Sequence, residues 1–232
     1  MPSDRDPFDL PMPAERYAEL VQRRRAAGAP DPLQPVPVRE PALRTGDLAR
    51  ALLAESAQRR LESGELLLIS EDASLGDLEQ AAAAVSPAAP RAVDTAVEPD
   101  PLLALLVAPR LLSPRVWAAL GWQPPLAEHW RLLVAALRGG AALSPVMLVG
   151  HLETWPERIE HLMRIRELQE LAAATGARLA IAVRQARLTD LPADERLTRI
   201  AAAARPADPA SDRRHAVALA RLALGPGSVL AD

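Results

Sequence analysis

The chain has 232 residues, of which 49% are hydrophobic and 25% are charged, and its formal net charge at pH 7 is −3. This length and composition allow a full hydrophobic core, so we expect a globular protein of one domain or a little more. The charge gives no sign of the basic stripe that a polyanion requires, so no nucleic acid partner is expected. All 27 basic residues are arginine, which we attribute to the coding bias of a GC-rich genome.

The chain contains no cysteine. Disulfides, thiolate zinc sites, cysteine nucleophiles and any iron–sulfur cluster held by the chain's own thiolates are therefore excluded. No apolar run approaches the ~20 residues that span a bilayer. The acidic, proline-bearing start lacks the basic and apolar regions of a signal peptide. We therefore expect a cytoplasmic protein with no membrane partner.

The N-terminal part of the chain divides into a helix and a proline-rich segment. The apolar pattern from Pro13 to Ala27 is typical of a helix. Prolines then recur from Pro30 to Pro41, where they forbid a regular helix and favour extended chain. We therefore expect a first domain at residues 1–41 and a second at residues 42–232.

The second domain is expected to begin with helices and a strand. A helix is predicted from about Gly46 to Leu61, with Ser63-Gly64 as its end. The apolar run Glu65 to Ile69 that follows is predicted to be a buried strand. Ser74 can then cap a further helix to about Val85.

The rest of the chain continues this alternation. Leu102 to Val107 is apolar throughout and fits either a strand or a buried helix. We expect further strands at Arg91–Val97, Pro145–Val149 and Arg178–Val183, and helices at Ser113–Leu120, Leu126–Leu137, Thr154–Ala174, Pro192–Ala204 and Asp212–Leu224. The alternation predicts an α/β fold in which parallel strands are joined by helices, and about five strands predict an open or partial TIM-like barrel.

One segment places polar groups where a strand ends. The strand at Pro145–Val149 is followed by Gly150, His151 and Glu153. Thr154 and Glu157 then have the spacing of a capping box, so a helix is expected to start there. Since α/β proteins bind ligands at the carboxyl ends of parallel strands, this turn is a candidate pocket. The alternative is that Gly150 and Glu153 serve only the turn and the helix start.

Other polar residues form weaker candidates. His151 and Glu153 fall short of the three ligands that a catalytic zinc requires, so no metal site is predicted. The adjacent carboxylates Glu71 and Asp72 would follow a strand and can support acid/base chemistry, although a solvated turn is the simpler interpretation. His161 is expected at the surface or at the rim of the fold. Helical spacing favours core or helix-contact roles for Trp117 and Trp130.

Three segments resemble a known family. Met147–Gln169 is similar to the Gly-His-Val-Glu-Thr strand and helix of the aminofutalosine synthase group, which contains radical SAM enzymes of the futalosine route to menaquinone and related enzymes of deazaflavin assembly. Leu111–Trp130 resembles the family's segment after its fourth strand, and Arg214–Leu224 its late helix. The resemblance covers residues 106–224 and extends more weakly back to about Val38. It implies a partial (β/α) barrel of the radical SAM type, with parallel strands and outer helices.

The chain departs from this family where the family's chemistry resides. The region corresponding to the cysteine loop that holds the iron–sulfur cluster is the proline-rich stretch at residues 28–41, so the resemblance implies neither cluster nor other cofactor. The family's glycine-rich turn after its second strand aligns with Ile69–Asp72. Its Pro-Leu-Ala-Phe-His pattern is replaced by Arg184-Gln-Ala-Arg-Leu188. The adenine-side motif remains, which implies that Leu148, Gly150 and Glu153 form a wall of a nucleoside pocket.

Three functions therefore stay open. The first is a non-catalytic, radical-SAM-like protein that accompanies or regulates an active radical SAM relative or another menaquinone-pathway enzyme. The second is a module that binds a nucleoside or an S-adenosylmethionine-type small molecule. The third is an enzyme with cluster-independent chemistry. The residues available for it are Glu71, Asp72, His151, Glu153 and Arg184.

Overall fold

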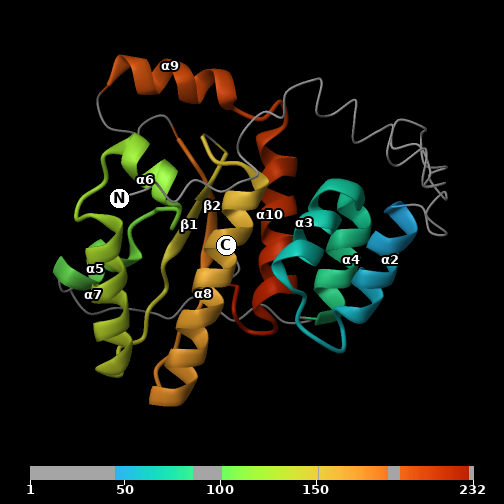
Figure 1. Ribbon diagram of the computed structural model, residues 1–232, viewed down its shortest axis with the longest axis horizontal. Helices are drawn as coiled ribbons and strands as arrows, with labels where there is room; N and C mark the ends of the chain where they lie inside the picture. Colours follow the sequence, from blue (N-terminus) through green and yellow to red (C-terminus); the bar gives the residue numbers. More distant parts are fainter. Residues whose placement is uncertain (1–44, 86–100, 151, 188–193, 230–232) are drawn as a thin grey trace, which may run out of the picture. The chain divides into compact units, whose positions relative to one another are not determined.

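The computed structural model describes residues 45–85, 101–150, 152–187 and 194–229, all of which belong to one compact unit, Thr45–Asp232. The predicted helix at Pro13–Ala27, the proline-rich segment, the domain boundary at residue 41 and the predicted strand at Arg91–Val97 lie outside these residues. Where the chain is described, it is an α/β structure that is mostly helical (Figure 1).

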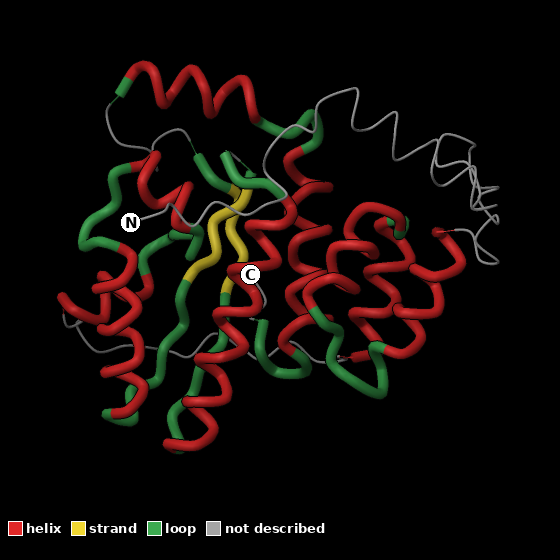
Figure 2. Tube along the Cα trace, in the orientation of Figure 1, coloured by secondary structure: helices red, strands yellow, loops and turns green. Residues whose placement is uncertain are grey.

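Two parallel strands form the centre of the unit (Figure 2). Strand β1 (Val146–Val149) pairs with strand β2 (Ala182–Gln185) in register along their whole length. Single parallel bridges extend the pair on both sides, from Arg110 to Met147 and from Ile181 to Val229. The sheet is not closed within the described residues, so the structure confirms an α/β fold with parallel pairing but does not show a TIM-like barrel.

Helices surround this pair. Helix α8 (Trp155–Thr175) joins β1 to β2, and α10 (Pro209–Leu224) contacts both strands and α8. Among the described helices, none combines the length and the apolar character needed to cross a bilayer. The others are α2 (Thr45–Glu55), α3 (Ser63–Asp72), α4 (Leu75–Val85), α5 (Pro101–Val107), α6 (Pro114–Leu120), α7 (Leu126–Arg138) and α9 (Glu195–Ala204).

The predicted strand, turn and helix at the centre are confirmed. Thr154 and Glu157 form the expected capping box, with the Thr154 amide donating to Glu157 Oε2 over 2.8 Å. The helix ends at Gly176, whose φ of 73° is the left-handed conformation that glycine adopts without steric cost. Local signals at both ends therefore position α8 between the two strands.

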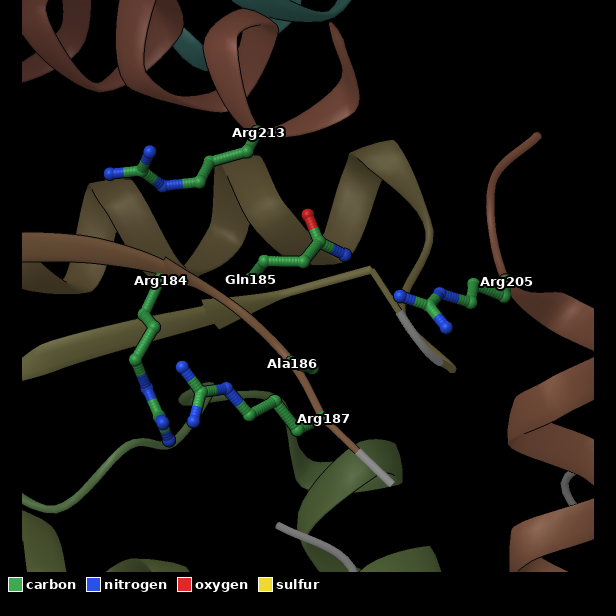
Figure 3. Close-up of a pocket in the computed structure, with 6 residues that line it drawn as sticks. All are labelled: Arg184, Gln185, Ala186, Arg187, Arg205 and Arg213. Carbon is green, nitrogen blue, oxygen red and sulfur yellow. The ribbon is translucent and has the colours of Figure 1, made fainter. Parts of the chain in front are cut away.

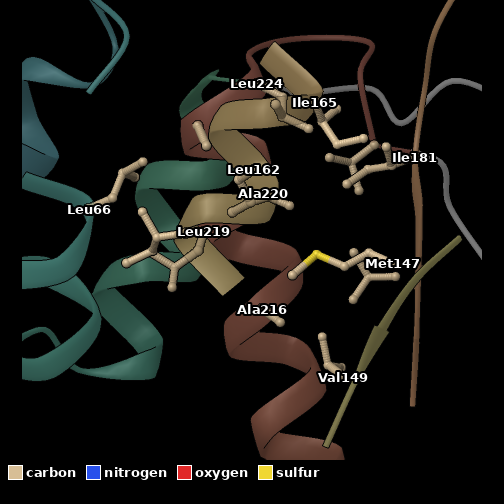
Figure 4. Packing of buried hydrophobic residues seen from close by; sticks show 14 of the residues in the cluster. Leu66, Met147, Val149, Leu162, Ile165, Ile181, Ala216, Leu219, Ala220 and Leu224 are labelled. Carbon is tan, nitrogen blue, oxygen red and sulfur yellow. The ribbon is translucent and has the colours of Figure 1, made fainter. Parts of the chain in front are cut away.

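The core lies between the strands and the helices α8 and α10. Met147 and Val149 alternate with Leu148 along β1, and both are buried in the core cluster (Figure 4). Figure 4 shows Ala216 and Ala220 of α10 on the side of that helix nearest β1. Since alanine has a small side chain, α10 can approach the strands closely at native packing density.

The predicted strand at Glu65–Ile69 is wrong, because these residues lie in helix α3. The helix begins with a capping box made by two glutamates, in which the Glu62 amide donates to Glu65 Oε2 over 2.8 Å. Leu66 and Ile69, three residues apart, are both fully buried on its inner face. A short apolar run fits either element, and here the capping glutamates favour the helix.

Other boundaries differ less. Leu102–Val107 adopts the helical one of its two predicted states, in α5. Helix α2 ends at Glu55, earlier than predicted, and the hydroxyl of Ser56 donates to the carbonyl of Leu53 over 2.6 Å just after its end. The predicted strand at Arg178–Val183 overlaps β2, which is displaced toward the carboxyl end of that segment.

The predicted surface position of His161 is also wrong. This residue is 3% exposed, and its Nδ1 accepts a hydrogen bond of 3.0 Å from the amide of Leu112. Burial, with a smaller contribution from the charge of Arg164, lowers the pKa of His161 to about 3. The ring therefore serves as a neutral acceptor that ties α8 to the chain just before α6.

Acid should consequently destabilise the fold through His161. In the unfolded chain the His161 ring binds a proton with a pKa of about 6.5, whereas in the folded chain it stays neutral down to about pH 3. The contribution of this residue is fully present above the unfolded pKa and is lost as pH falls. We expect the free energy of unfolding to drop by about 2 kcal/mol between pH 7 and pH 5 on account of His161. Urea unfolding should give a shallower pH dependence for His161→Gln than for the wild type, and equal slopes would contradict the assignment.

Candidate functional site

The carboxyl end of β1 turns sharply at Gly150. Its φ is 100°, a backbone conformation that residues other than glycine rarely adopt. A Cβ at this position would overlap the side-chain amide of Gln185, at the end of the neighbouring strand. The turn therefore favours glycine for its backbone conformation, and a side chain at this position would also displace the Gln185 amide.

A buried ion-pair network follows the turn. Glu153 Oε1 accepts from the amide of Gly150 and from Arg158 Nε and Nη2, the latter over 3.1 and 2.7 Å. Arg158 also binds Asp212 of α10 through two hydrogen bonds of 2.7 and 2.8 Å. The side chains of Arg158, Glu153 and Asp212 are only 6%, 4% and 13% exposed. The network therefore joins the β1 turn, the start of α8 and the start of α10.

Aromatic rings cover the guanidinium of this network. The Arg158 Cζ lies 4.3 Å from the centre of the Trp155 ring, a cation–π arrangement. The Trp155 ring in turn lies 4.5 Å from that of His215. Burial lowers the pKa of His215, and the positive charge of Arg158 lowers it further. The imidazole is thus favoured in its neutral form beside the charged arginine.

A cavity of about 330 Å³ lies over Gly150. Its walls combine the ion-pair network with one aromatic ring and with the segment that joins α9 to α10. Because Arg158 binds both carboxylates, the charged groups of the wall are paired with one another. The lining residues are Gly150, Glu153, Thr154, Trp155, Arg158, Ala204, Pro206 and Asp212.

A second cavity, of about 430 Å³, lies at the carboxyl end of β2. Figure 3 shows Arg184 and Arg187 on one side of the β2 segment, with their guanidinium groups pointing toward one another. Gln185 and Arg213 lie on the other side. The lining residues are Arg184, Gln185, Ala186, Arg187, Arg205 and Arg213. Only Arg184 was a candidate from the sequence, and Gln185, Ala186 and Arg187 follow it directly in the chain. Arg205 and Arg213 come from two separate segments, for which no local pattern gives a signal.

The remaining sequence candidates do not join these cavities. Leu148 is 5% exposed, and its amide donates to the carbonyl of Arg110, so it is a buried strand residue. Glu71 and Asp72 were predicted to follow a strand, and this is wrong. They lie exposed in the last turn of α3. Neither lines the cavity at Gly150 or the one at Arg184. His151 lies outside the described residues.

The metal and aromatic candidates from the sequence can be compared directly with the structure. Among the described residues, no group of three or more His, Cys, Asp or Glu side chains is placed to hold a metal ion. Trp117 is 4% exposed and packs in the core, and Trp130 is partly buried against that core, as predicted from helical spacing.

A comparison with protein-family models, with curated proteins and with solved structures found no match to this chain. The resemblance to the aminofutalosine synthase group therefore depends on the quoted segments alone.

Loss of the Arg158 charge should strongly destabilise the fold. Arg158→Met keeps an apolar side chain of similar length but leaves Glu153 and Asp212 without their shared cation. Removing one partner of a buried ion pair typically costs about 3–5 kcal/mol. The matched control is Arg164→Met on the same helix, whose partly exposed pair with Glu160 is worth only about 0.3–0.5 kcal/mol. Similar losses for the two variants in urea unfolding would contradict a structural role for the network.

Proposed function

We propose that this chain acts by binding a small molecule of the nucleoside type, not by catalysis, and that the ligand enters the cavity over Gly150. The observation that carries this proposal is the cavity of about 330 Å³ at the carboxyl end of β1, which is the edge where parallel α/β folds bind ligands. Its volume lies within the ~300–1,000 Å³ typical of small-molecule sites.

The state of the wall residues favours binding over catalysis. A general acid or base needs a carboxylate that can exchange a proton with the substrate. Glu153 Oε1 instead accepts from Gly150 and from Arg158, and both oxygens of Asp212 accept from Arg158. Glu71 and Asp72 line neither cavity. These contacts support the binding hypothesis over the hypothesis of a cluster-independent enzyme.

The same contacts indicate the character of the ligand. Two carboxylates, Glu153 and Asp212, share the single positive charge of Arg158, so the wall retains a net negative charge. A neutral or cationic molecule with a flat ring fits such a surface better than an anion. Adenosine and S-adenosylmethionine are therefore suitable probes.

The radical SAM relationship remains part of the proposal. The parallel segments at Arg110, β1, β2 and Val229 lie side by side in chain order, and this order supports a partial barrel of that type. The helix at Ser63–Asp72, in place of a strand, argues against extending the barrel to that region. Since no cysteine is present, the proposed ligand is bound without a cluster.

Calorimetry on the full chain tests the binding site. We expect saturable heat with adenosine or with S-adenosylmethionine, and we expect Ala204→Trp to remove it, because a large side chain there would fill the cavity. The matched control is Ala203→Trp, also exposed near the end of α9 but outside the cavity lining, and it should bind as the wild type does. Absence of heat with both ligands, or equal binding by the two variants, would disprove the proposal.

A second candidate function is that of a non-catalytic partner of an active radical SAM relative in menaquinone biosynthesis. It is favoured by the preserved Gly150–Thr154 turn and helix start in a chain without the cluster cysteines. Co-expression with such an enzyme should give a complex in size-exclusion chromatography and a change in the enzyme's rate. Two proteins that elute separately, with a rate unchanged on mixing, would rule this role out.

A further inference from the structure

We infer that the cavity at the carboxyl end of β2 is a second binding site, specific for a small anionic molecule that carries a phosphate or several carboxylate groups. This site is separate from the cavity over Gly150, and it does not depend on the function proposed for that cavity.

The position of the cavity is the first argument. Gln185 is the last residue of β2, and Arg184 and Ala186 flank it. The cavity thus opens where a parallel strand ends, beside the segment that connects α9 to α10. Ligands of open parallel α/β sheets bind at this edge because loops and helix starts converge there.

The lining residues are the second argument. The described residues around the cavity comprise four arginines, one glutamine and one alanine, and none of them is acidic. Arginine stays protonated at any physiological pH, and its planar fork matches the oxygens of phosphate and carboxylate groups. Since every basic residue of this chain is arginine, the choice of arginine over lysine is not informative. The informative feature is that separate segments bring four of them to one cavity in a chain of net charge −3.

Gln185 supplies an independent observation. Both its amide nitrogen and its amide oxygen are buried, and neither has a hydrogen-bond partner among the described residues. Leaving a buried polar group without a hydrogen bond is energetically costly, so native proteins rarely do it without another reason. A bound oxyanion would accept a hydrogen bond from the Gln185 amide, and this residue already lines the cavity.

The arginines combine rigid and accessible members. Arg184 belongs to β2, and Arg213 Nε donates to the carbonyl of Val183 over 2.9 Å, which docks α10 on the strand. Arg187 and Arg205 are exposed, so solvent and ligand can reach them. Side chains held on regular elements form the base of the site, and exposed ones can close on the anion from the rim.

The size of the cavity indicates a small molecule. About 430 Å³ lies within the range of metabolite sites. Nucleic acid would require a basic stripe over a larger surface, and the net charge of −3 disfavours it.

Titration of the full chain with pyrophosphate and with citrate, in a buffer free of other multivalent anions, tests this site. We expect saturable binding of at least one anion, which also identifies the preferred group. Raising the salt from about 50 to about 200 mM should weaken it. The double variant Arg187→Gln/Arg205→Gln should raise the Kd at least about tenfold, because each exposed arginine contributes a charge-assisted hydrogen bond.

The matched control is Arg131→Gln/Arg138→Gln, which changes the net charge equally through two exposed arginines of α7. It should bind the anion as the wild type does. No binding of either anion, equal affinity in the two double variants, or tighter binding of a single-stranded oligonucleotide would overturn the inference. Adenosine binding by the Arg187→Gln/Arg205→Gln variant tests the Gly150 cavity separately, so the two proposals can fail independently.

Discussion

The arrangement of this fold depends on one buried guanidinium. Arg158 binds Glu153 on one side and Asp212 on the other, and its side chain is 6% exposed. Burying three charges is costly, and it is tolerated only where hydrogen bonds and geometry compensate the lost hydration. Here the Gly150 amide and the Trp155 ring add to that compensation. As a result, the end of β1, the start of α8 and the start of α10 are held at one point, and both cavities open beside it.

The two cavities differ because their charges are arranged differently. Over Gly150, two carboxylates share one arginine of the same wall, so the surface keeps a net negative charge. At the end of β2, arginines converge without an acidic residue among the described lining. Gln185 lies between the two cavities. Its side-chain amide packs on Gly150, and the same residue also lines the second cavity. One contact therefore separates a surface suited to a neutral or cationic molecule from a surface suited to an anion.

How much of this was predictable depends on the range of the interactions. The β1 strand and α8 follow from neighbouring residues: the capping box, the first-turn proline and Gly176 all act within one turn. The strand predicted at Glu65–Ile69 was wrong because the short apolar run Leu66–Ile69 does not distinguish a strand from a helix, and glutamates instead of Ser or Thr form the cap. The buried His161 ring accepts a hydrogen bond from the amide of Leu112, which is distant in the sequence. The arginine cavity is likewise lined by three segments that are separated along the chain. Such long-range contacts leave no periodic pattern in the sequence.

The Gly150–Thr154 segment carries the sequence resemblance to the aminofutalosine synthase group, and two of its residues, Gly150 and Glu153, have local structural reasons. Gly150 is favoured by its φ, and Glu153 is held by the Arg158 network. A turn with these requirements can retain the same residues whether or not a ligand is bound. Arg184 and Arg187, in contrast, belong to a segment that departs from the pattern expected from the resemblance, and both line the cavity at the end of β2. That cavity is therefore a better place to look for a function than the turn, whose residues have structural reasons of their own.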